Sequence, residues 1–411
     1  MLGISYRQAT LTPKLLVQTP LALLGLVLVA VTSFSAAQAS TNIPTIATYA
    51  YVIDFTSGRV LIEKQKDAPM KPASMAKIMT AYIVFDRIAE GSLELTDQFI
   101  VSEKAWKMGG SRSFLQAGRS YSLDELLHGV IVQSGNDAAV VIAEGISGTE
   151  ENFVTEMNIT AAELGMTNTK FTNSTGWPDP ELSTTAHDLA LLSTALIKNF
   201  PADKYPDLYP IFKKKTYTLN EIKQGNRNPL LYGKESQSKG VDGLKTGYTS
   251  ESGYGLVASA ERNGQRVIMV LNGMDSKKER SAESRRLLDF IFREYRNYEF
   301  FEAGEIIDRA EVWLGDARHV SLVLEDEFSK VLSRAERAKT DLRVTWADPV
   351  AAPISKSQKI GELVVTIDGS VANRLPLLAA EDVAQLGILE RVGEALKYLI
   401  FGAPVIKTPG E

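Results

Sequence analysis

The sequence contains no cysteine, which excludes disulfide bonds, a cysteine nucleophile and every metal site built on thiolates. It has only three histidines, His128, His187 and His319, so a histidine-rich metal cage is not expected, nor is any other metal or cofactor. It also lacks a basic run, and 45 Lys plus Arg against 50 Asp plus Glu give a net charge of −5. A mildly acidic chain of this kind is a poor candidate for nucleic-acid binding. Any acyl chemistry is therefore expected to proceed without a histidine base.

The overall composition is that of an ordinary globular protein. The chain has 411 residues, of which 44% are hydrophobic and 23% charged, so it is long enough for two or three domains with a sizeable core. There is no glycine period, and only one long apolar run occurs. These two absences exclude a collagen-like chain and a polytopic membrane protein.

The single apolar run lies near the N-terminus. It covers residues 21–34, follows Arg7 and Lys14, and precedes an A-x-A site at residues 37–39. This order is typical of a secretory signal peptide, and the run is shorter than the ~20 residues that an uncleaved spanning anchor needs. We therefore expect residues 1–39 to be removed and the protein to be exported. Without cysteine, a bacterial periplasm or wall space suits it better than a disulfide-built secreted domain.

Hydrophobic periodicity predicts an α/β domain over residues 40–301, because strand patterns stand on both sides of a helical block. Asn263-Gly264 is the strongest hairpin signal in the chain. The expected strands are 47–54, 59–63, 254–261 and 265–272, and the expected helices are 73–90, 123–132, 137–144, 151–164, 185–197 and 280–295.

Residues 302–380 have a different character and predict a small β-sandwich. Short strand patterns separated by turn residues lie at 310–314, 319–324, 342–346 and 362–367. From Val383 to Ile400 apolar residues recur every three to four positions, which predicts an amphipathic helix. That helix could lie in a membrane interface or dock on its own domain; its polar face is net acidic, whereas interfacial helices are usually rich in Lys and Arg.

Three short motifs carry the candidate chemistry. Ser74-Met75-Ala76-Lys77 places an amine one helical turn from a hydroxyl, so that Lys77 could take the proton that makes Ser74 a nucleophile. A second S-x-x-K, residues 236–239, lies between glycines without a helical pattern and is expected to be a loop. Ser134-Gly135-Asn136 alone would be read as a helix cap, and Lys245-Thr246-Gly247 alone as a turn or a strand. Their order S-x-x-K, S-x-N, K-T-G is the set found in class A β-lactamases and penicillin-binding proteins.

With these motifs and the strings at residues 72–77, 134–138, 165–169, 226–228 and 242–247, the chain resembles the low-molecular-mass penicillin-binding proteins, serine D-alanyl-D-alanine carboxypeptidases of the DacA type (peptidase family S11). The resemblance spans essentially the whole mature chain. It implies a β-lactamase/transpeptidase-like catalytic domain, an antiparallel sheet with helices, over 40–301, and a C-terminal β-sandwich over 302–380. It further implies a helix over 381–402 that attaches to the outer face of the inner membrane, with a tail over 403–411.

The resemblance also implies roles for the motif residues. Ser74 would attack the carbonyl between the last two D-alanines of a peptidoglycan stem peptide, Lys77 would be the general base, and Ser134 would relay a proton to the departing D-alanine. The backbone N–H groups of Ser74 and Tyr248 would hold the oxyanion. β-Lactam antibiotics such as penicillin would acylate the same serine.

The remaining implied roles concern substrate binding. Asn136 would hold the amide carbonyl of the substrate, while Lys245 and Thr246 would bind its terminal carboxylate beside Gly247. Arg280 matches a family arginine near the cleft and could add a second carboxylate contact, or it could be a solvated arginine at a helix start. His187 is expected to be structural.

Three alternatives share the motifs. A class A β-lactamase uses a Glu-x-x-Leu-Asn string to hold its deacylating water, whereas the closest string here, residues 179–183, reads Asp-Pro-Glu-Leu-Ser. The chain also continues well beyond such a domain. A D,D-endopeptidase usually lacks the added β module and tail. A catalytically idle wall-binding protein is disfavoured by the intact motifs.

Overall fold

The computed structural model describes residues 43–233, 240–346 and 350–401. The expected signal peptide, the second S-x-x-K at residues 236–239 and the expected tail at 403–411 lie outside these ranges. Within them no helix is long and apolar enough to cross a membrane.

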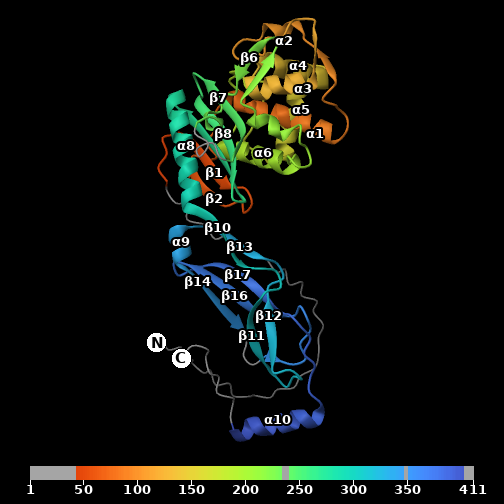
Figure 1. Cartoon of the computed structure of the whole chain (residues 1–411), viewed down its shortest axis with the longest axis vertical. Helices are drawn as coiled ribbons and strands as arrows, with labels where there is room; N and C mark the ends of the chain where they lie inside the picture. Colours follow the sequence, from red (N-terminus) through yellow and green to blue (C-terminus); the bar gives the residue numbers. More distant parts are fainter. Residues whose placement is uncertain (1–42, 234–239, 347–349, 402–411) are drawn as a thin grey trace, which may run out of the picture. The chain divides into compact units, whose positions relative to one another are not determined.

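An antiparallel five-stranded sheet forms the centre of the N-terminal α/β domain (Figure 1). Its order is β2-β1-β9-β8-β7, so β1 pairs with β9, a strand more than 200 residues further along the chain, and β2 forms the edge beside β1. The Asn263-Gly264 turn is confirmed: both residues have positive φ, 51° and 75°, as a two-residue hairpin requires. The strands are β1 (Tyr49–Asp54), β2 (Val60–Lys64), β7 (Val241–Thr249), β8 (Gly253–Arg262) and β9 (Gln265–Met274).

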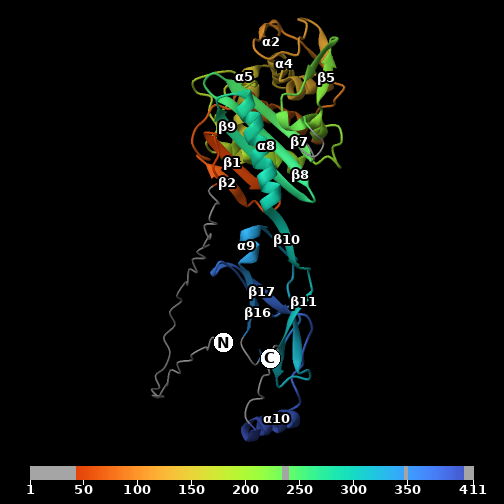
Figure 2. The same cartoon turned by 60° about the vertical axis from the view of Figure 1, so that its left-hand side comes forward.

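Alternation along these strands buries both faces of the sheet, in two separate cores. In β9, Met269 and Leu271 face the core that contains α8 (Lys277–Glu294), whereas Ile268 and Val270 face the helical block. Figure 2 shows α8 lying across one face of the sheet. The helical block consists of α1 (Lys77–Ala89), α2 (Glu103–Lys107), α3 (Leu123–His128), α4 (Asn136–Ser147), α5 (Glu150–Glu163) and α6 (Ala186–Asn199).

Short elements connect the block to the sheet and shape the site. The helix expected from residue 73 is divided, because η1 (Ala73–Ala76) is a 3₁₀ turn and the α-helix begins only at Lys77. The expected helix 123–132 is likewise α3 followed by a π-helical turn, η2 (Gly129–Gln133). The other connecting elements are the hairpins β3–β4 (Gln98–Ile100, Ser120–Ser122) and β5–β6 (Thr216–Leu219, Ile222–Gly225) and the turns η3 (Tyr209–Lys213) and η4 (Pro229–Leu231).

The C-terminal region is a β domain with its own apolar core. A six-stranded sheet of order β14-β16-β17-β12-β11-β15 and a two-stranded sheet, β10-β13, supply that core. The elements are β10 (Tyr295–Phe301), β11 (Ile306–Trp313), β12 (His319–Val323), β13 (Phe328–Ser333), α9 (Arg334–Ala338), β14 (Thr340–Trp346), β15 (Val350–Ala351), β16 (Lys359–Ile367) and β17 (Ser370–Ala379).

The amphipathic segment after the β domain forms a helix, α10 (Ile388–Phe401), but this helix begins later than the periodicity predicted. Val383, the first residue of the predicted pattern, is buried in the β-domain core and pairs with Ile354 as an isolated β-bridge. The first residue of the periodic pattern therefore packs into the β domain instead of joining the helix, and the helix starts five residues further on.

Candidate active site

The three motifs come together in the folded chain. Lys77 Nζ lies 3.2 Å from Ser74 Oγ and 2.7 Å from Asn136 Oδ1. Lys245 Nζ lies 2.7 Å from Ser134 Oγ. The motifs sit on η1 and α1, at the junction of η2 and α4, and on β7, so a helical block and a sheet edge both contribute to one site.

Ser74 is presented on the 3₁₀ turn η1, where two glycines allow other segments to approach the backbone closely. A Cβ on Gly247 of β7 would lie 2.7 Å from the carbonyl oxygen of Pro72. A Cβ on Gly176 would lie 1.8 Å from the carbonyl oxygen of Ala73. Any side chain at these positions would push β7 or the 173–177 loop away from the turn that carries Ser74.

Lys77 is 1% exposed, and its amine has three oxygen partners. It donates to the Thr175 carbonyl at 2.6 Å and to Asn136 Oδ1 at 2.7 Å, and Ser74 Oγ is the third at 3.2 Å. A neutral amine has two N–H groups and one lone pair. Because the carbonyl and the amide can accept both N–H groups, the lone pair is left for the Ser74 hydroxyl.

The electrostatic surroundings favour the neutral amine. Burial is the main reason that the pKa of Lys77 falls to about 7, and the nearby Arg227 guanidinium lowers this pKa further. The Asp137 carboxylate opposes the shift. At neutral pH a substantial fraction of Lys77 is therefore able to accept a proton.

Ser134 occupies a left-handed backbone conformation, with φ of 61°, directly after η2. The motif was open to a helix-cap interpretation, but α4 has Gly135 as its N-cap and receives no side-chain cap bond. Instead, the buried Ser134 hydroxyl faces Lys245. The adjacent Asp137 carboxylate accepts the backbone N–H groups of Ser113 and Leu115, which fixes the neighbouring loop.

Asn136 already has partners for both ends of its amide. Its Nδ2 donates to the Gly109 carbonyl at 2.7 Å, while its Oδ1 accepts from Lys77. The expected bond from Asn136 to the substrate amide carbonyl stays a prediction. The contacts present in the structure show that this side chain holds the Lys77 amine.

Lys245, Thr246 and Gly247 lie within β7, so this motif is part of a strand rather than a turn. Burial lowers the pKa of Lys245, and the positive charges of Lys77, Arg227 and Arg280 act in the same direction. Thr246 is also buried, whereas the ring of Tyr248 is exposed and stacks on Tyr254 with centroids 4.1 Å apart.

Arg280 is buried, which rules out the solvated helix-start arginine considered from the sequence. Its Nη1 lies 3.4 Å from the carbonyl oxygens of Gly247 and Gly255, and its guanidinium lies over the Tyr254 ring. Burial lowers the pKa of Arg280 to about 10. The Arg280 guanidinium thus places a positive charge against the backbone of β7 and β8. A contact between Arg280 and a substrate carboxylate stays a prediction.

Arg227 is the site residue for which sequence reasoning gave no role. It follows β6 and donates to the Gln133 carbonyl at 2.5 Å, one residue before Ser134. Its charge lowers the pKa of both Lys77 and Lys245. The string at residues 226–228 was part of the family resemblance, but nothing in three polar residues indicates which of them faces two lysines.

His187, expected to be structural, has structural contacts. Its Nδ1 lies 3.0 Å from Asp67 Oδ1, and its ring packs edge-on against Tyr51.

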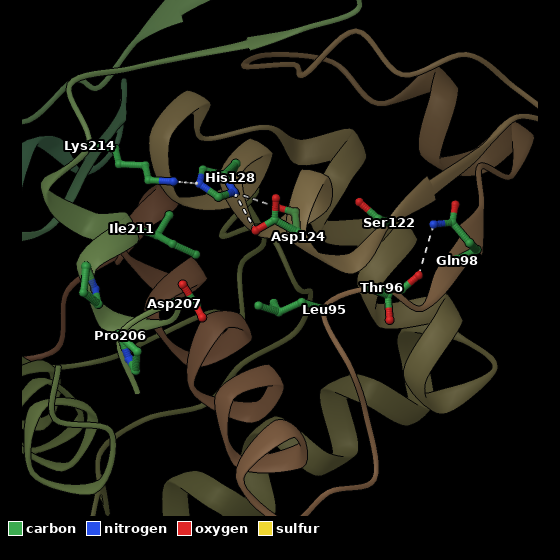
Figure 3. Close-up of a pocket in the computed structure, with 11 residues that line it drawn as sticks. Leu95, Thr96, Gln98, Ser122, Asp124, His128, Pro206, Asp207, Ile211 and Lys214 are labelled. Carbon is green, nitrogen blue, oxygen red and sulfur yellow. Dashed lines mark hydrogen bonds and ion pairs between the residues drawn. The ribbon is translucent and has the colours of Figure 1, made fainter. Parts of the chain in front are cut away.

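A separate pocket has a volume of about 510 Å³, and its lining contains none of the motif residues. Figure 3 shows the residues that line it. His128, at the end of α3, lies between two partners there: its Nδ1 is 2.8 Å from the Asp124 carbonyl and its Nε2 is 2.5 Å from Lys214 Nζ (Figure 3). Because an ammonium can only donate, Nε2 accepts and Nδ1 carries the proton. The imidazole is therefore neutral in this arrangement.

Comparison with known proteins agrees with this geometry. The family model described as D-alanyl-D-alanine carboxypeptidase (peptidase S11) matches residues 35–276, and that for the C-terminal domain of penicillin-binding protein 5 matches residues 295–385. D-alanyl-D-alanine carboxypeptidase DacA of Haemophilus influenzae is 36% identical over 366 residues, 87% of this chain and 91% of that protein.

Two solved structures extend the comparison. Penicillin-binding protein 5 from Haemophilus influenzae has a TM-score of 0.67 at 34% identity, covering 84% of this chain and 99% of that one. Penicillin-binding protein D2 from Listeria monocytogenes, solved in an ampicillin-bound form, has a TM-score of 0.54 at 29% identity, covering 62% of this chain and all of that one, 100%.

The fold and the site thus define a serine acyl-transfer enzyme of the penicillin-binding class. The chain belongs to the D-alanyl-D-alanine carboxypeptidase family, peptidase S11, and is a carboxypeptidase of that family with its C-terminal β domain.

Proposed function

We propose that the chain removes the terminal D-alanine from peptidoglycan stem pentapeptides through an acyl-enzyme on Ser74, and so limits cross-linking of the wall. The orientation of the Lys77 amine carries this proposal. Its two N–H groups have carbonyl acceptors, and its third partner is the Ser74 hydroxyl. A base held in this way is ready to accept the proton of its nucleophile.

In the acylation step, Ser74 Oγ forms a bond to the carbonyl carbon between the last two D-alanines, and Lys77 takes the hydroxyl proton. The C–N bond then breaks: Ser134 gives its hydroxyl proton to the departing D-alanine amine and takes one from the Lys245 ammonium, which donates a hydrogen bond to it. The backbone N–H groups of Ser74 and Tyr248 hold the oxyanion. Each such donor is typically worth about 10²–10³ in rate.

Substrate binding depends on the terminal carboxylate. Lys245 and Thr246 lie in the middle of β7, and the Arg280 guanidinium contacts the same strand at the Gly247 carbonyl, so an anion beside them meets positive potential. The carboxylate favours the protonated form of Lys245, and burial of that lysine is then compensated by a partner of opposite charge. Asn136 and Gly247 position the peptide backbone. Water finally attacks the Ser74 ester, releasing the shortened peptide and restoring the hydroxyl.

β-Lactams resemble the D-Ala-D-Ala end, and we propose that they acylate Ser74 by the same route. The test is intact mass over time after benzylpenicillin is added to residues 40–411 and to Ser74→Ala, with D-alanine release measured in parallel. A one-to-one adduct present only in the Ser74 enzyme, with D-alanine release that the variant lacks, supports the proposal. Fast drug hydrolysis without adduct would indicate a β-lactamase, and neither adduct nor hydrolysis a binding protein.

We further propose that the mature chain is exported and attaches to the outer face of the inner membrane through α10. Exposed apolar side chains on this helix support the proposal, with Ile388 73% and Leu389 88% exposed and Val392 and Leu396 more than half exposed. Residues 40–411 should co-sediment with liposomes, and a chain ending at Gly387 should not. Equal sedimentation of the two would contradict attachment through α10.

A further inference from the structure

The carbonyl that orients Lys77 belongs to a loop without regular secondary structure. Thr175 and its neighbour Ser174 lie between α5 and α6 and are both buried. The Asn173 side chain accepts the N–H groups of Thr175 and Trp177 and the Thr175 hydroxyl, and so shapes the turn internally. Internal bonds do not set the distance between the Thr175 carbonyl and α1. Contacts with neighbouring helices must do so.

Two such contacts hold Ser174 from opposite sides. On α1, Thr80 Oγ1 donates to the Ser174 carbonyl at 2.7 Å, one turn after Lys77. On α5, Glu150 Oε1 accepts both the Ser174 N–H at 3.0 Å and the Ser174 hydroxyl at 2.8 Å. The next residue, Thr175, then directs its carbonyl at Lys77 Nζ.

Glu150 is unusual for the first residue of a helix, where carboxylates commonly face solvent and interact with the helix dipole. Here the residue is only 9% exposed, and its side chain is directed at the loop. Its second oxygen pairs with Lys104 Nζ at 3.0 Å, so the buried charge is compensated. Glu151, next in sequence, also pairs with Lys104, yet its side chain is 77% exposed and no contact links it to Ser174.

We propose that Glu150 is a positioning residue for the general base: by holding Ser174 it fixes the Thr175 carbonyl against Lys77 and so directs the amine lone pair at Ser74. The inference rests on the proposed role of Lys77. Without the Glu150 carboxylate, the Ser174 N–H and hydroxyl lose their acceptor and the carbonyl withdraws from the amine. The Lys77 amine then lacks one of the acceptors that fix its orientation and can rotate away from Ser74, while Lys245 and Thr246 remain in place.

Two kinetic consequences distinguish positioning from a purely structural role. Acylation slows without a change in KM, because the carboxylate-binding residues are untouched, and a displacement of about 1 Å can cost on the order of 10²-fold. The pH at which the acylation rate rises (the rising limb of the pH profile) should also fall. The Thr175 carbonyl stabilises the charged ammonium of Lys77 more than the neutral amine, so loss of this contact lowers the pKa of Lys77.

The experiment compares residues 40–411 with Glu150→Ala, Glu150→Gln and the matched control Glu151→Ala. Acylation by benzylpenicillin and kcat and KM for a D-Ala-D-Ala peptide are measured from pH 5 to 9, with thermal unfolding as the check on folding. We expect Glu150→Ala to lose about 10- to 100-fold in acylation rate and kcat, with an unchanged KM and a limb at lower pH. Glu150→Gln keeps an amide oxygen for Ser174 and recovers most of the rate, and Glu151→Ala matches wild type.

Wild-type kcat and an unmoved pH limb in folded Glu150→Ala would overturn the inference. An equal loss in Glu151→Ala would also overturn it, because the effect would then come from Lys104. If Glu150→Ala does not fold, Ser174→Ala replaces it: removal of one of the two bonds should lower kcat at unchanged KM, and unchanged kcat would count against the proposal. Failure of the proposed function is separate, because Ser74→Ala would then still release D-alanine.

Discussion

Asn136 Oδ1 and Lys77 Nζ are 2.7 Å apart, and this bond joins the second motif to the first. The same amide donates to the Gly109 carbonyl through Nδ2, so Asn136 links Lys77 to the loop that follows α2. A neutral acceptor in this position orients the amine without adding a negative charge that would keep it protonated.

Replacement of that neutral acceptor by a charged one should impair the base. In Asn136→Asp a carboxylate stands beside Nζ, and an opposite charge at this distance raises the pKa of a lysine. We expect the rising limb of the acylation rate to move to higher pH, with a lower rate at pH 7. Stopped-flow acylation across pH tests this, and an unchanged limb would show that Asn136 and Lys77 are not coupled in solution.

The wild-type rate itself should depend on Lys77. Because the pKa of Lys77 is lowered to about 7, acylation is expected to rise as pH increases through 7 and the amine loses its proton. Lys77→Arg keeps a proton at every accessible pH and should be inactive throughout. Acylation of wild type at a constant rate from pH 5 to 9 would remove Lys77 from the role of base.

Arg227 should set the pH at which the acylation rate rises. Its charge lowers the pKa of Lys77, so Arg227→Gln is expected to raise this pKa and to move the limb to higher pH. The glutamine amide can still donate to the Gln133 carbonyl, which preserves the loop contact made by the arginine. Arg285→Gln on α8 serves as the control for loss of one positive charge. Equal shifts in the two variants would assign the effect to net charge alone.

Gly176 should be intolerant of a methyl group for a reason beyond its backbone angle. Both Gly176 (φ 77°) and Gly165 (φ 78°) have left-handed conformations, but a Cβ on Gly165 meets nothing within 4 Å. Each alanine variant carries a strain of roughly 1 kcal/mol or more. Only Gly176→Ala also displaces the backbone of Ala73, so we expect a larger loss of thermal stability and slow acylation. Equal behaviour of the two variants would contradict the packing argument.

His128 should make stability depend on pH. Burial lowers the pKa of His128 in the folded state, with Lys214 acting in the same direction and the Asp124 contacts opposing. The unfolded state therefore binds the proton more readily, and stability falls as pH decreases below about 6.5. Chemical denaturation between pH 5 and 8 should show this decrease in wild type and a smaller one in His128→Gln, with His319→Gln as control. Equal slopes in all three chains would exclude His128 as the source.

Much of the fold was predictable because long elements carry strong periodicity. The β8–β9 hairpin and α6 lie close to their predicted ranges. Elements such as β5, β6 and β17 were missed because their side chains alternate weakly between buried and exposed, and neighbouring strands rather than local sequence decide their conformation. Tertiary contacts also explain the late start of α10, because Val383 packs in the β-domain core.

That the motif residues come together was predictable because their side chains define the motifs, but their environment was not. The Thr175 carbonyl is main chain, and every residue has one, so no sequence pattern distinguishes it. Arg280 was open to two interpretations, a carboxylate contact near the cleft or a solvated arginine at a helix start, and only the packing of α8 on the sheet shows that it is buried. Arg227 contributes through space to two lysines that are distant in sequence.

The approach of Gly247 to the Pro72 carbonyl packs β7, which lies far along the sequence, against the turn that carries Ser74, the proposed nucleophile. With Ser74 as the proposed nucleophile, a nascent chain is expected to have no reactive serine until β7, β8 and β9 have been translated and docked. A fluorescent penicillin added during refolding would thus count only molecules with a complete catalytic domain, and labelling would serve as a quality assay for the protein.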